Sequence, residues 1–307
     1  MPSFFSDGMV LQQKSTALLW GWADSGEKVS VQFLDQETTA TTNPDGKWTI
    51  ELKELKASQQ GANLTVTVGN DTKVIKDVLV GEVWIASGQS NMEWTTRKLK
   101  DVKTYSSAKD DLIRVYVSKN HTAAEEIKDF PGSWLSTTPG NTEKFTAVGY
   151  HFAHSLRKEL NVPVGIIECA WSGKRIEPFI SDPAMKQAKD LDYLVKAKDE
   201  AIKKYSPEAA QKKFDKDMAS WTVKNEKWEQ EKNGRRPRKP KLQESPLVHP
   251  NLHSTIYNGM IAPIAGYSAK GIIWYQGESN TRDRSAQDYG ALLKLCLLYT
   301  SPSPRDS

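Results

Sequence analysis

Three short polar turns, each placed directly after an apolar run, carry residue types that suit the hydrolysis of an ester. The first turn, Ser87–Trp94, reads Ser-Gly-Gln-Ser-Asn-Met-Glu-Trp; the second is Trp171–Lys174, and the third is Gln276–Asn280. In an open parallel sheet the carboxyl ends of the strands line the ligand crevice. We therefore expect the three turns to meet in one site, although they are far apart in the sequence.

Within the first turn, Ser90 has the position of a nucleophile. A serine at a strand-to-helix junction exposes its hydroxyl, and the N–H groups that follow it can stabilise an oxyanion. The pattern is not a Gly-x-Ser-x-Gly elbow, because no glycine lies two residues after Ser90. The motif taken alone is equally consistent with an ordinary helix N-cap. Its position after a buried run, together with the other two turns, favours the nucleophile.

The residues around these turns predict two kinds of domain. Residues 1–78 hold short runs rich in Val, Thr, Trp and Leu, separated by turn sequences such as Asp45-Gly46. Asp-Gly between alternating runs is a strong hairpin signal, and turns at this spacing predict a small β-sandwich. Nothing in this first stretch is chemically reactive.

Residues 79–295 predict an α/β domain. Phe145–Leu160 places its apolar residues at helical spacing. Three apolar runs predict strands that are buried on both faces of a parallel sheet: Val78–Ala86, Val164–Trp171 and Ala269–Tyr275. Strand, helix and strand in this order make an α/β unit.

The composition is that of a globular protein of about two domains. The 307 residues have 38% hydrophobic content and a mean hydropathy of −0.60, and no apolar run is long enough for a membrane span. Two cysteines cannot make a disulfide framework. The net charge of +4 comes from residues 186–245, which hold 17 basic and 11 acidic residues. We expect a solvated helical insertion there, and no nucleic-acid partner, because no recognition fold accompanies the charges.

These motifs resemble a known family. Gly88–Trp94 is similar to the first block of the SGNH hydrolases, specifically of their sialate O-acetylesterase-like carbohydrate esterases. Pro2–Gln12 resembles the start of that group's N-terminal β-domain, Val162–Gly173 its second block, and Tyr257–Asn280 its third region. The resemblance implies a three-layer α/β SGNH-hydrolase sheet, incomplete in this chain and preceded by the small N-terminal β-sandwich domain.

The resemblance assigns roles by position. Ser90 matches the nucleophile, and its N–H matches one donor to the oxyanion. Gly173 matches a glycine that donates its backbone N–H to the same oxyanion. Gln276 or Asn280 matches the third, side-chain donor; we favour Gln276, but the sequence does not separate the two. Ser172 is a departure, because relatives often carry glycine there.

The implied reaction removes an O-acetyl group from a sugar through an acetyl-enzyme on Ser90. It requires neither a metal nor an organic cofactor, and the expected partner is an O-acetylated carbohydrate. Further residues are expected to line the site: Gln89, Asn91 and Glu278.

A serine esterase also needs a base, and none of the motifs supplies one. In SGNH hydrolases the base is a histidine on an Asp-x-x-His turn after the third block. All five histidines of this chain precede that block, and none has Asp three residues before it: His121, His151, His154, His249 and His253. We expect them to be structural or solvated, with His253 the foremost substitute.

The end of the sequence suggests an explanation. Residues 296–307 resemble a translated sequencing-library adapter more than a natural disordered tail, and we treat them as artefactual. The expectation is then a truncated reading frame, with the catalytic His and Asp in the lost part and a chain that is nearly inactive. No signal peptide precedes Met1; for the full-length parent the resemblance implies a periplasmic or secreted protein.

Two other functions stay open. An acetylated xylan, or another plant polysaccharide, competes with O-acetyl sialic acid as the substrate. The chain is alternatively a non-catalytic carbohydrate-binding protein with a Trp-lined cleft, although such a module has no need of a nucleophile. The sequence does not indicate an oligomeric state.

Overall fold

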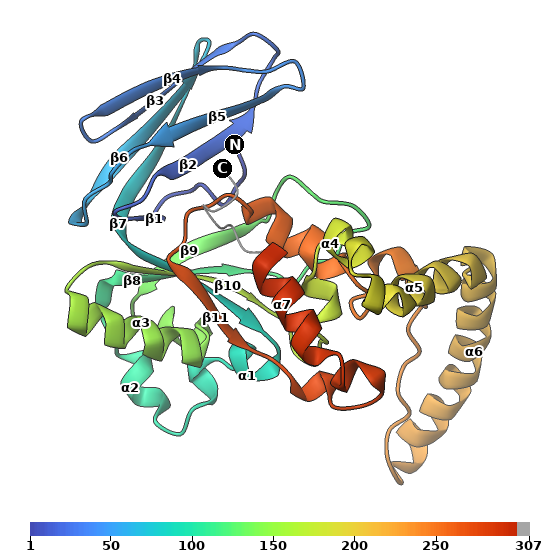
Figure 1. The fold of residues 1–307 in the computed structure, drawn as a ribbon. Coiled ribbons are helices and arrows are strands. Elements are labelled where there is room, and N and C mark those ends of the chain that lie inside the picture. Colours follow the sequence, from blue (N-terminus) through green and yellow to red (C-terminus); the bar gives the residue numbers. More distant parts are fainter. Residues whose placement is uncertain (300–307) are drawn as a thin grey trace.

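The computed structural model describes residues 1–299, and two β-rich halves share one long strand in it (Figure 1). The strands are β1 (Val10–Gln12), β2 (Ala17–Trp22), β3 (Lys28–Phe33), β4 (Gln36–Thr41), β5 (Lys47–Leu52), β6 (Ser58–Val68), β7 (Asp71–Gly88), β8 (Asp110–Ser118), β9 (Gly132–Thr137), β10 (Val164–Ala170) and β11 (Gly271–Tyr275). The helices are α1 (Ser90–Glu93), α2 (Val102–Ser106), α3 (Ala147–Leu160), α4 (Asp182–Gln187), α5 (Asp192–Lys204), α6 (Pro207–Glu231) and α7 (Tyr289–Tyr299).

The N-terminal half consists of two β-sheets. Strands β4, β3, β6 and the first part of β7 form an antiparallel sheet, and β1 lies parallel to β7. Strands β2 and β5 form a separate antiparallel pair. The alternation of β3 and β5 buries every second side chain, so Val29 and Val31 share one core with Trp48 and Ile50. This confirms the predicted N-terminal β domain.

The second half is an α/β sheet with strand order β11-β7-β10-β8-β9. All neighbours are parallel except the edge strand β9, which runs antiparallel to β8. The predicted apolar runs form β10, β11 and the second part of β7. The α/β class is therefore confirmed, with a mixed rather than a wholly parallel sheet.

Helices cover both faces of this sheet and give it three layers (Figure 1). Helix α3 packs on one face, where Tyr150 and Ala153 join Ala86 and Ile166 in a buried cluster. A π-helix (Tyr257–Ile261), a 3-10 turn (Ala262–Ile264) and α7 cover the other face. Successive residues of β7 point to opposite faces, so the central strand is buried on both sides.

Strands β8 and β9 were not among the predicted strands, and the charge within β8 explains why. Arg114 lies in the middle of β8, yet it is 4% exposed. Its guanidinium donates to the carbonyl oxygens of Gly8 and Asp77 and forms an ion pair with the Asp77 carboxylate at 2.8 Å. A strand interrupted by a buried charge does not show the apolar pattern of its neighbours.

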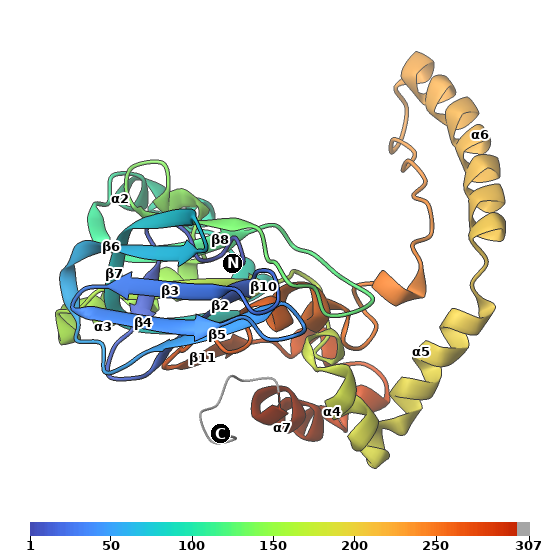
Figure 2. The same cartoon turned by 90° about the horizontal axis from the view of Figure 1, so that it is seen from above.

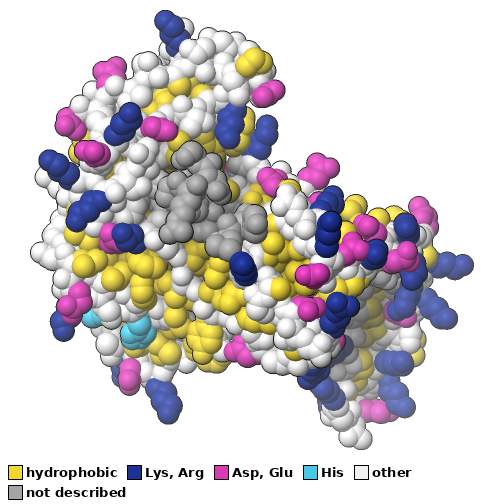
Figure 3. Space-filling model, viewed as in Figure 1, with side chains coloured by type: hydrophobic (Ala, Val, Ile, Leu, Met, Phe, Trp, Pro, Cys, Tyr) yellow, Lys and Arg dark blue, Asp and Glu magenta, His cyan; other side chains and the backbone are white. Residues whose placement is uncertain are grey.

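The charged insertion at 186–245 forms an arm that stands away from the body (Figure 2). Helix α6 builds the arm, helix α5 connects it to the body, and residues 232–245 return along α6. Basic and acidic side chains alternate over this side of the molecule (Figure 3), as expected of a solvated helix pair. Among residues 1–299, no helix combines the length and the hydropathy needed to cross a membrane.

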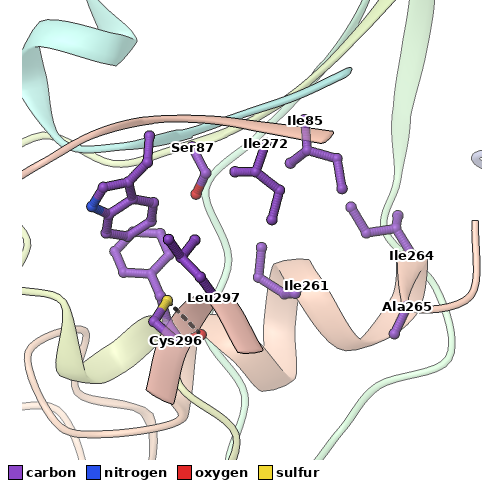
Figure 4. Close-up of a pocket in the computed structure, with 10 residues that line it drawn as sticks. Ile85, Ser87, Ile261, Ile264, Ala265, Ile272, Cys296 and Leu297 are labelled. Carbon is purple, nitrogen blue, oxygen red and sulfur yellow. Dashed lines mark hydrogen bonds between the residues drawn. The ribbon is translucent and has the colours of Figure 1, made fainter. Parts of the chain in front are cut away.

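An apolar pocket lies between β11 and the helices on its face (Figure 4). Ile85 and Ile272 of the sheet face Ile261 and Leu297 across it, and Cys296 donates to the Phe179 carbonyl beside it. Of the tail predicted at 296–307, residues 296–299 thus continue α7. Residues 300–307 lie outside the described residues.

Candidate active site

The three polar turns begin at the same level of the sheet. In the strand register, Gly88 of β7 lies beside Ala170 of β10 on one side and beside Tyr275 of β11 on the other. Backbone hydrogen bonds continue past the strand ends: the Trp171 N–H donates to the Gly88 carbonyl, and the Gln89 N–H donates to the Tyr275 carbonyl, both at 3.0 Å. Adjacent parallel strands therefore deliver the three turns to one edge.

Gly88 is the residue that lets β7 turn into α1 at this point. Its φ is +140°, a conformation that L side chains rarely adopt, and a methyl group there would lie 2.2 Å from the Tyr275 carbonyl oxygen. The close approach of β11 leaves room only for glycine. Ser90 follows two residues later as the first residue of α1.

Side chains of the first turn bind the third turn directly. The Gln89 Oε1 accepts from the N–H groups of Gly277 (3.3 Å) and Ser279 (3.1 Å), and Gln89 is 3% exposed. The Asn91 amide donates to the Glu278 carboxylate. The residues predicted to line the site thus lie on either side of Ser90 and hold the third turn against it.

The first and second turns are joined by Glu93, which the sequence analysis did not single out. Its Oε2 accepts from the backbone N–H of Ser172 at 2.7 Å and also from the Ser172 hydroxyl. Its Oε1 accepts from the Asn120 amide at 2.8 Å. One carboxylate therefore connects α1 with the second turn and with the segment after β8. Its presence in the quoted motif was the available signal; its partners lie far away in the sequence.

The second and third turns are joined through two amide side chains. Gln276 Nε2 donates to the Lys174 carbonyl (3.1 Å) and to Asn280 Oδ1 (2.7 Å). Asn280 Oδ1 also accepts from the Ile176 N–H (3.0 Å), while its Nδ2 donates to Glu177 (3.0 Å). Every pair of turns therefore shares at least one hydrogen bond from a side chain.

The two candidates for the third oxyanion donor differ in their surroundings. Asn280 is 2% exposed, and both atoms of its amide are bound inside the protein, Nδ2 also to the Ser285 hydroxyl. Gln276 is half-buried and its Oε1 accepts from the Tyr289 hydroxyl at 2.7 Å. Asn280 thus ties the third turn to Ile176 and Glu177, which follow the second turn, whereas Gln276 binds the second turn itself. Both amides are bound within the protein, and Gln276 lies nearer the surface.

Ser90 is half-buried, and its N–H lies in the first turn of α1, where helical N–H groups have no acceptor within the helix. Gly173 is exposed, with φ +69° and open space around its Cα. Within residues 1–299, no side chain hydrogen-bonds the Ser90 hydroxyl. The site therefore presents a free hydroxyl beside unpaired backbone donors.

No histidine of the chain pairs with Ser90. The foremost substitute, His253, is 4% exposed; its Nδ1 lies 3.0 Å from the Ser254 hydroxyl and 3.7 Å from Asp182. Burial, followed by the charge of Lys198, lowers the pKa of His253 to about 4. His151 contacts the Tyr105 hydroxyl at 3.0 Å. Both imidazoles are thus engaged with groups other than the nucleophile.

A second carboxyl group lies near Glu93. Glu168 of β10 is half-buried, and its buried Oε2 atom has no hydrogen-bond partner among the described residues. Burial raises the pKa of Glu168 to about 8, and the charge of Glu93 adds to the increase. From the sequence alone, Glu168 is expected in a buried strand and has no predicted role. A pKa in this range favours the protonated form of Glu168 at neutral pH.

The sheet and its two helical layers form an α/β fold like that of the SGNH hydrolases. Residues 80–210 match the family model of carbohydrate esterases described as sialic acid-specific acetylesterases. A sialate O-acetylesterase of Rattus norvegicus is 30% identical over 319 residues, which cover 95% of this chain and 54% of that protein. The Homo sapiens sialate O-acetylesterase is 26% identical, with 91% and 48% covered. These matches confirm the predicted resemblance to the sialate O-acetylesterase-like carbohydrate esterases.

A solved structure supports the same conclusion. The crystal structure of a carbohydrate acetylesterase from Xanthomonas citri matches with a TM-score of 0.73 at 26% identity, over 96% of this chain and 55% of that one. The chain spans about half the length of the curated relatives it matches. The relatives are carboxylic ester hydrolases by name.

Proposed function

We propose that this chain carries the nucleophile and the oxyanion site of a serine esterase that removes O-acetyl groups from carbohydrates. One observation carries the proposal: strands β10, β7 and β11 end at the same edge of the sheet. Ser90 lies on the turn after β7, and the turns after β10 and β11 are hydrogen-bonded to that turn. A nucleophile flanked by fixed backbone donors suits acyl transfer.

In the proposed reaction, the Ser90 Oγ attacks the carbonyl carbon of the acetyl ester while its proton passes to a base. The N–H groups of Ser90 and Gly173 stabilise the oxyanion. The amide of Gln276 joins them by exchanging one of its present acceptors, the Lys174 carbonyl or Asn280 Oδ1, for the oxyanion. The sugar oxygen leaves with a proton, so that acetyl-Ser90 forms. Water then attacks this ester, releases acetate and restores the hydroxyl.

We infer that the base comes from polypeptide outside residues 1–299. The support is that all five histidines lie within the described residues and that none of them hydrogen-bonds Ser90. The chain as given should therefore hydrolyse esters only slowly. Removing the base of a serine hydrolase leaves some catalysis through the oxyanion site and binding, so a weak Ser90-dependent activity is consistent with the proposal.

The test compares this chain with a longer version read from the source DNA, both assayed on an aryl acetate. We expect rapid turnover only in the longer protein, and its loss by about 10³-fold or more in Ser90→Ala. Ser25→Ala is the matched control, because Ser25 is an exposed serine of the N-terminal domain. Turnover by the short chain at the rate of the long one would refute the inference about the base.

The identity of the substrate is tested with the longer protein, by comparing two acetylated carbohydrates. The curated relatives carry the name sialate O-acetylesterase, which favours O-acetyl sialic acid over acetylated xylan; acetate release from the two should be measured side by side.

The missing partner of Ser90 favours one other function, a carbohydrate-binding protein without catalysis. Sugar binding that Ser90→Ala leaves unchanged, with no acetate released by the longer protein, would select that function.

A further inference from the structure

The second turn has a conformation that decides where one backbone N–H points. Residues Trp171–Lys174 form a tight turn, which the Lys174 N–H closes by donating to the Trp171 carbonyl at 3.3 Å. Gly173 has φ +69°, whereas Ser172 is not among the residues with positive φ. Positive φ at the third residue alone is the mark of a type II turn.

In a type II turn the middle peptide plane is rotated by roughly 180° from its orientation in a type I turn. Here the middle peptide joins Ser172 to Gly173 and carries the Gly173 N–H. A change between the two turn types would therefore reverse the direction of this N–H while the ends of the turn stayed in place. Glycine at position 173 permits both forms, because it adopts either sign of φ.

The Glu93 carboxylate lies against this turn and binds it twice. Its Oε2 accepts from the N–H of Ser172, at 2.7 Å, and from the hydroxyl of the same residue. Its Oε1 is held by the Asn120 amide at 2.8 Å. Asn120 thus fixes the position of the Glu93 carboxylate, and the carboxylate fixes both the backbone and the side chain of Ser172. Ser172 directly precedes the peptide that carries the Gly173 N–H.

We propose that Glu93 is a positioning residue that holds the second turn in its type II form and so keeps the Gly173 N–H directed toward the oxyanion. The inference rests on the proposed function for the purpose of that N–H, but not for the conformation of the turn. The Ser172 hydroxyl supplies a second bond to Glu93, which the glycine that relatives often carry at this position lacks. Glu93 acts through the turn and does not itself touch the substrate.

The first test follows the turn alone, in the chain as it exists. In protein labelled with ¹⁵N-serine and ¹⁵N-glycine, amide exchange and chemical shifts report on Ser172 and Gly173. A hydrogen bond to a charged acceptor is worth enough to predict exchange at Ser172 at least about tenfold faster in Glu93→Ala. Glu93→Gln, which keeps one acceptor oxygen and the size of the side chain, should restore part of the protection.

Ser172→Ala removes only the bond from the hydroxyl, so we expect a smaller loss of amide protection than in Glu93→Ala. Combining the two substitutions should cause no further loss beyond that of Glu93→Ala alone. Glu226→Ala, at an exposed carboxylate on α6, is the matched control and should leave both amides unchanged. Core amides such as that of Ile166 verify that each variant is folded. Unchanged exchange and shifts at Ser172 and Gly173 in folded Glu93→Ala would overturn the proposal.

The second test uses the longer, active protein. Loss of a positioned oxyanion donor lowers kcat, because the donor acts in the transition state, and leaves KM nearly unchanged. We expect a decrease in kcat of about 10- to 100-fold for Glu93→Ala and a partial recovery in Glu93→Gln. An altered turn with an unaltered kcat would overturn the positioning role. An altered turn in a protein without Ser90-dependent hydrolysis would instead refute the proposed function and keep the conformational part.

Discussion

At the residue scale, the polar groups around Ser90 serve mainly to hold three chain segments together. Gln89 and Asn91 bind the third turn, Glu93 binds the second, and Ser90 between them has a hydroxyl with no partner among residues 1–299. Net hydrogen-bond energies are modest when both groups can return to water. Their value here is geometric, since they fix the backbone donors before any ester arrives.

We expect Glu168 to make the stability of the folded protein depend on pH. Its pKa is raised to about 8 in the folded protein from an ordinary value of 4.5, so between these pH values the folded state keeps a proton that the unfolded state has lost. The contribution of Glu168 to stability is therefore lost as the pH rises through this window. Glu168→Gln should remove the effect and gain stability relative to the natural residue at pH 9 but not at pH 4.

Urea unfolding at pH 4, 7 and 9 measures this difference, which we expect to grow by a few kcal/mol across the series (about 1.4 kcal/mol per pKa unit). Glu159→Gln, at an exposed carboxyl group of α3, is the control and should show no such trend. Parallel pH profiles for Glu168→Gln and the natural protein would contradict the assignment of a buried, protonated carboxyl group.

The residue types at the site were predictable from the sequence, but the hydrogen-bond partner of each residue was not. Ser90 and its neighbours stand in one short motif after an apolar run, so a local pattern reveals them. The partners of Glu93 are Ser172 and Asn120, which no local pattern connects to it. The same limit left Gln276 and Asn280 unresolved, because their partners in and after the second turn also lie far away in the sequence.

At the element scale, the arm built by α6 and its return segment is nearly independent of the body. Ala210 is the one residue of α6 that is buried. The indoles of Trp221 and Trp228 donate to carbonyl groups of the arm's own return segment, at 3.1 and 3.0 Å. Helix α5, in contrast, is anchored, because Lys198 is buried and donates to the His253 carbonyl at 2.9 Å.

Replacing residues 207–242 by a short Gly-Ser linker should therefore change the melting temperature of the body by only a few degrees. The Tyr205 hydroxyl lies 3.3 Å from the Gln243 carbonyl, so the two ends are close enough to join. Thermal unfolding followed by circular dichroism gives the measurement. Lys198→Ala serves as the contrast and should destabilise, because it leaves the His253 carbonyl unpaired. A fall of more than about 10 °C on removing the arm would show that α6 supports the body.

Elements with a regular apolar pattern were predictable from the sequence, and strands that bury little apolar surface were not. β5, α3 and β10 follow simple periodic patterns, so the predicted ranges nearly coincide with the observed ones. β4 reads Gln-Glu-Thr-Thr-Ala-Thr, because as an edge strand it buries little. The tertiary position of such a strand decides its conformation, and its sequence carries no apolar signal of it.

At the scale of the whole molecule, the two halves are connected by more than a linker. β7 belongs to both sheets, and residue 78, where the sequence analysis placed the domain boundary, lies inside it. Buried polar bonds reinforce the junction: Gln13 donates to Glu82 at 2.7 Å, and the Val83 N–H donates to Gln12 at 2.8 Å. A polar first part and an apolar second part concealed the continuity of this strand in the sequence.

We therefore expect both halves to unfold together. Protein labelled with 5-fluorotryptophan reports on them separately: Trp20 and Trp48 lie in the N-terminal half, whereas Trp134 and Trp274 lie in the other. The native ¹⁹F resonances of all four should disappear at the same urea concentration. A lower midpoint for Trp20 and Trp48 alone would show that β7 does not couple the sheets.

The shared strand also affects how the chain is made. The first part of β7 pairs with β6, which precedes it directly, but its second part must wait for β10, which begins at residue 164, and for β11, which begins at residue 271. At ~5–20 residues per second, synthesis reaches β10 on the order of ten seconds after β7. During that interval an apolar strand with unpaired edges continues from an already ordered sheet, so nascent chains should be most prone to aggregation there, before the hydrolase half has a core.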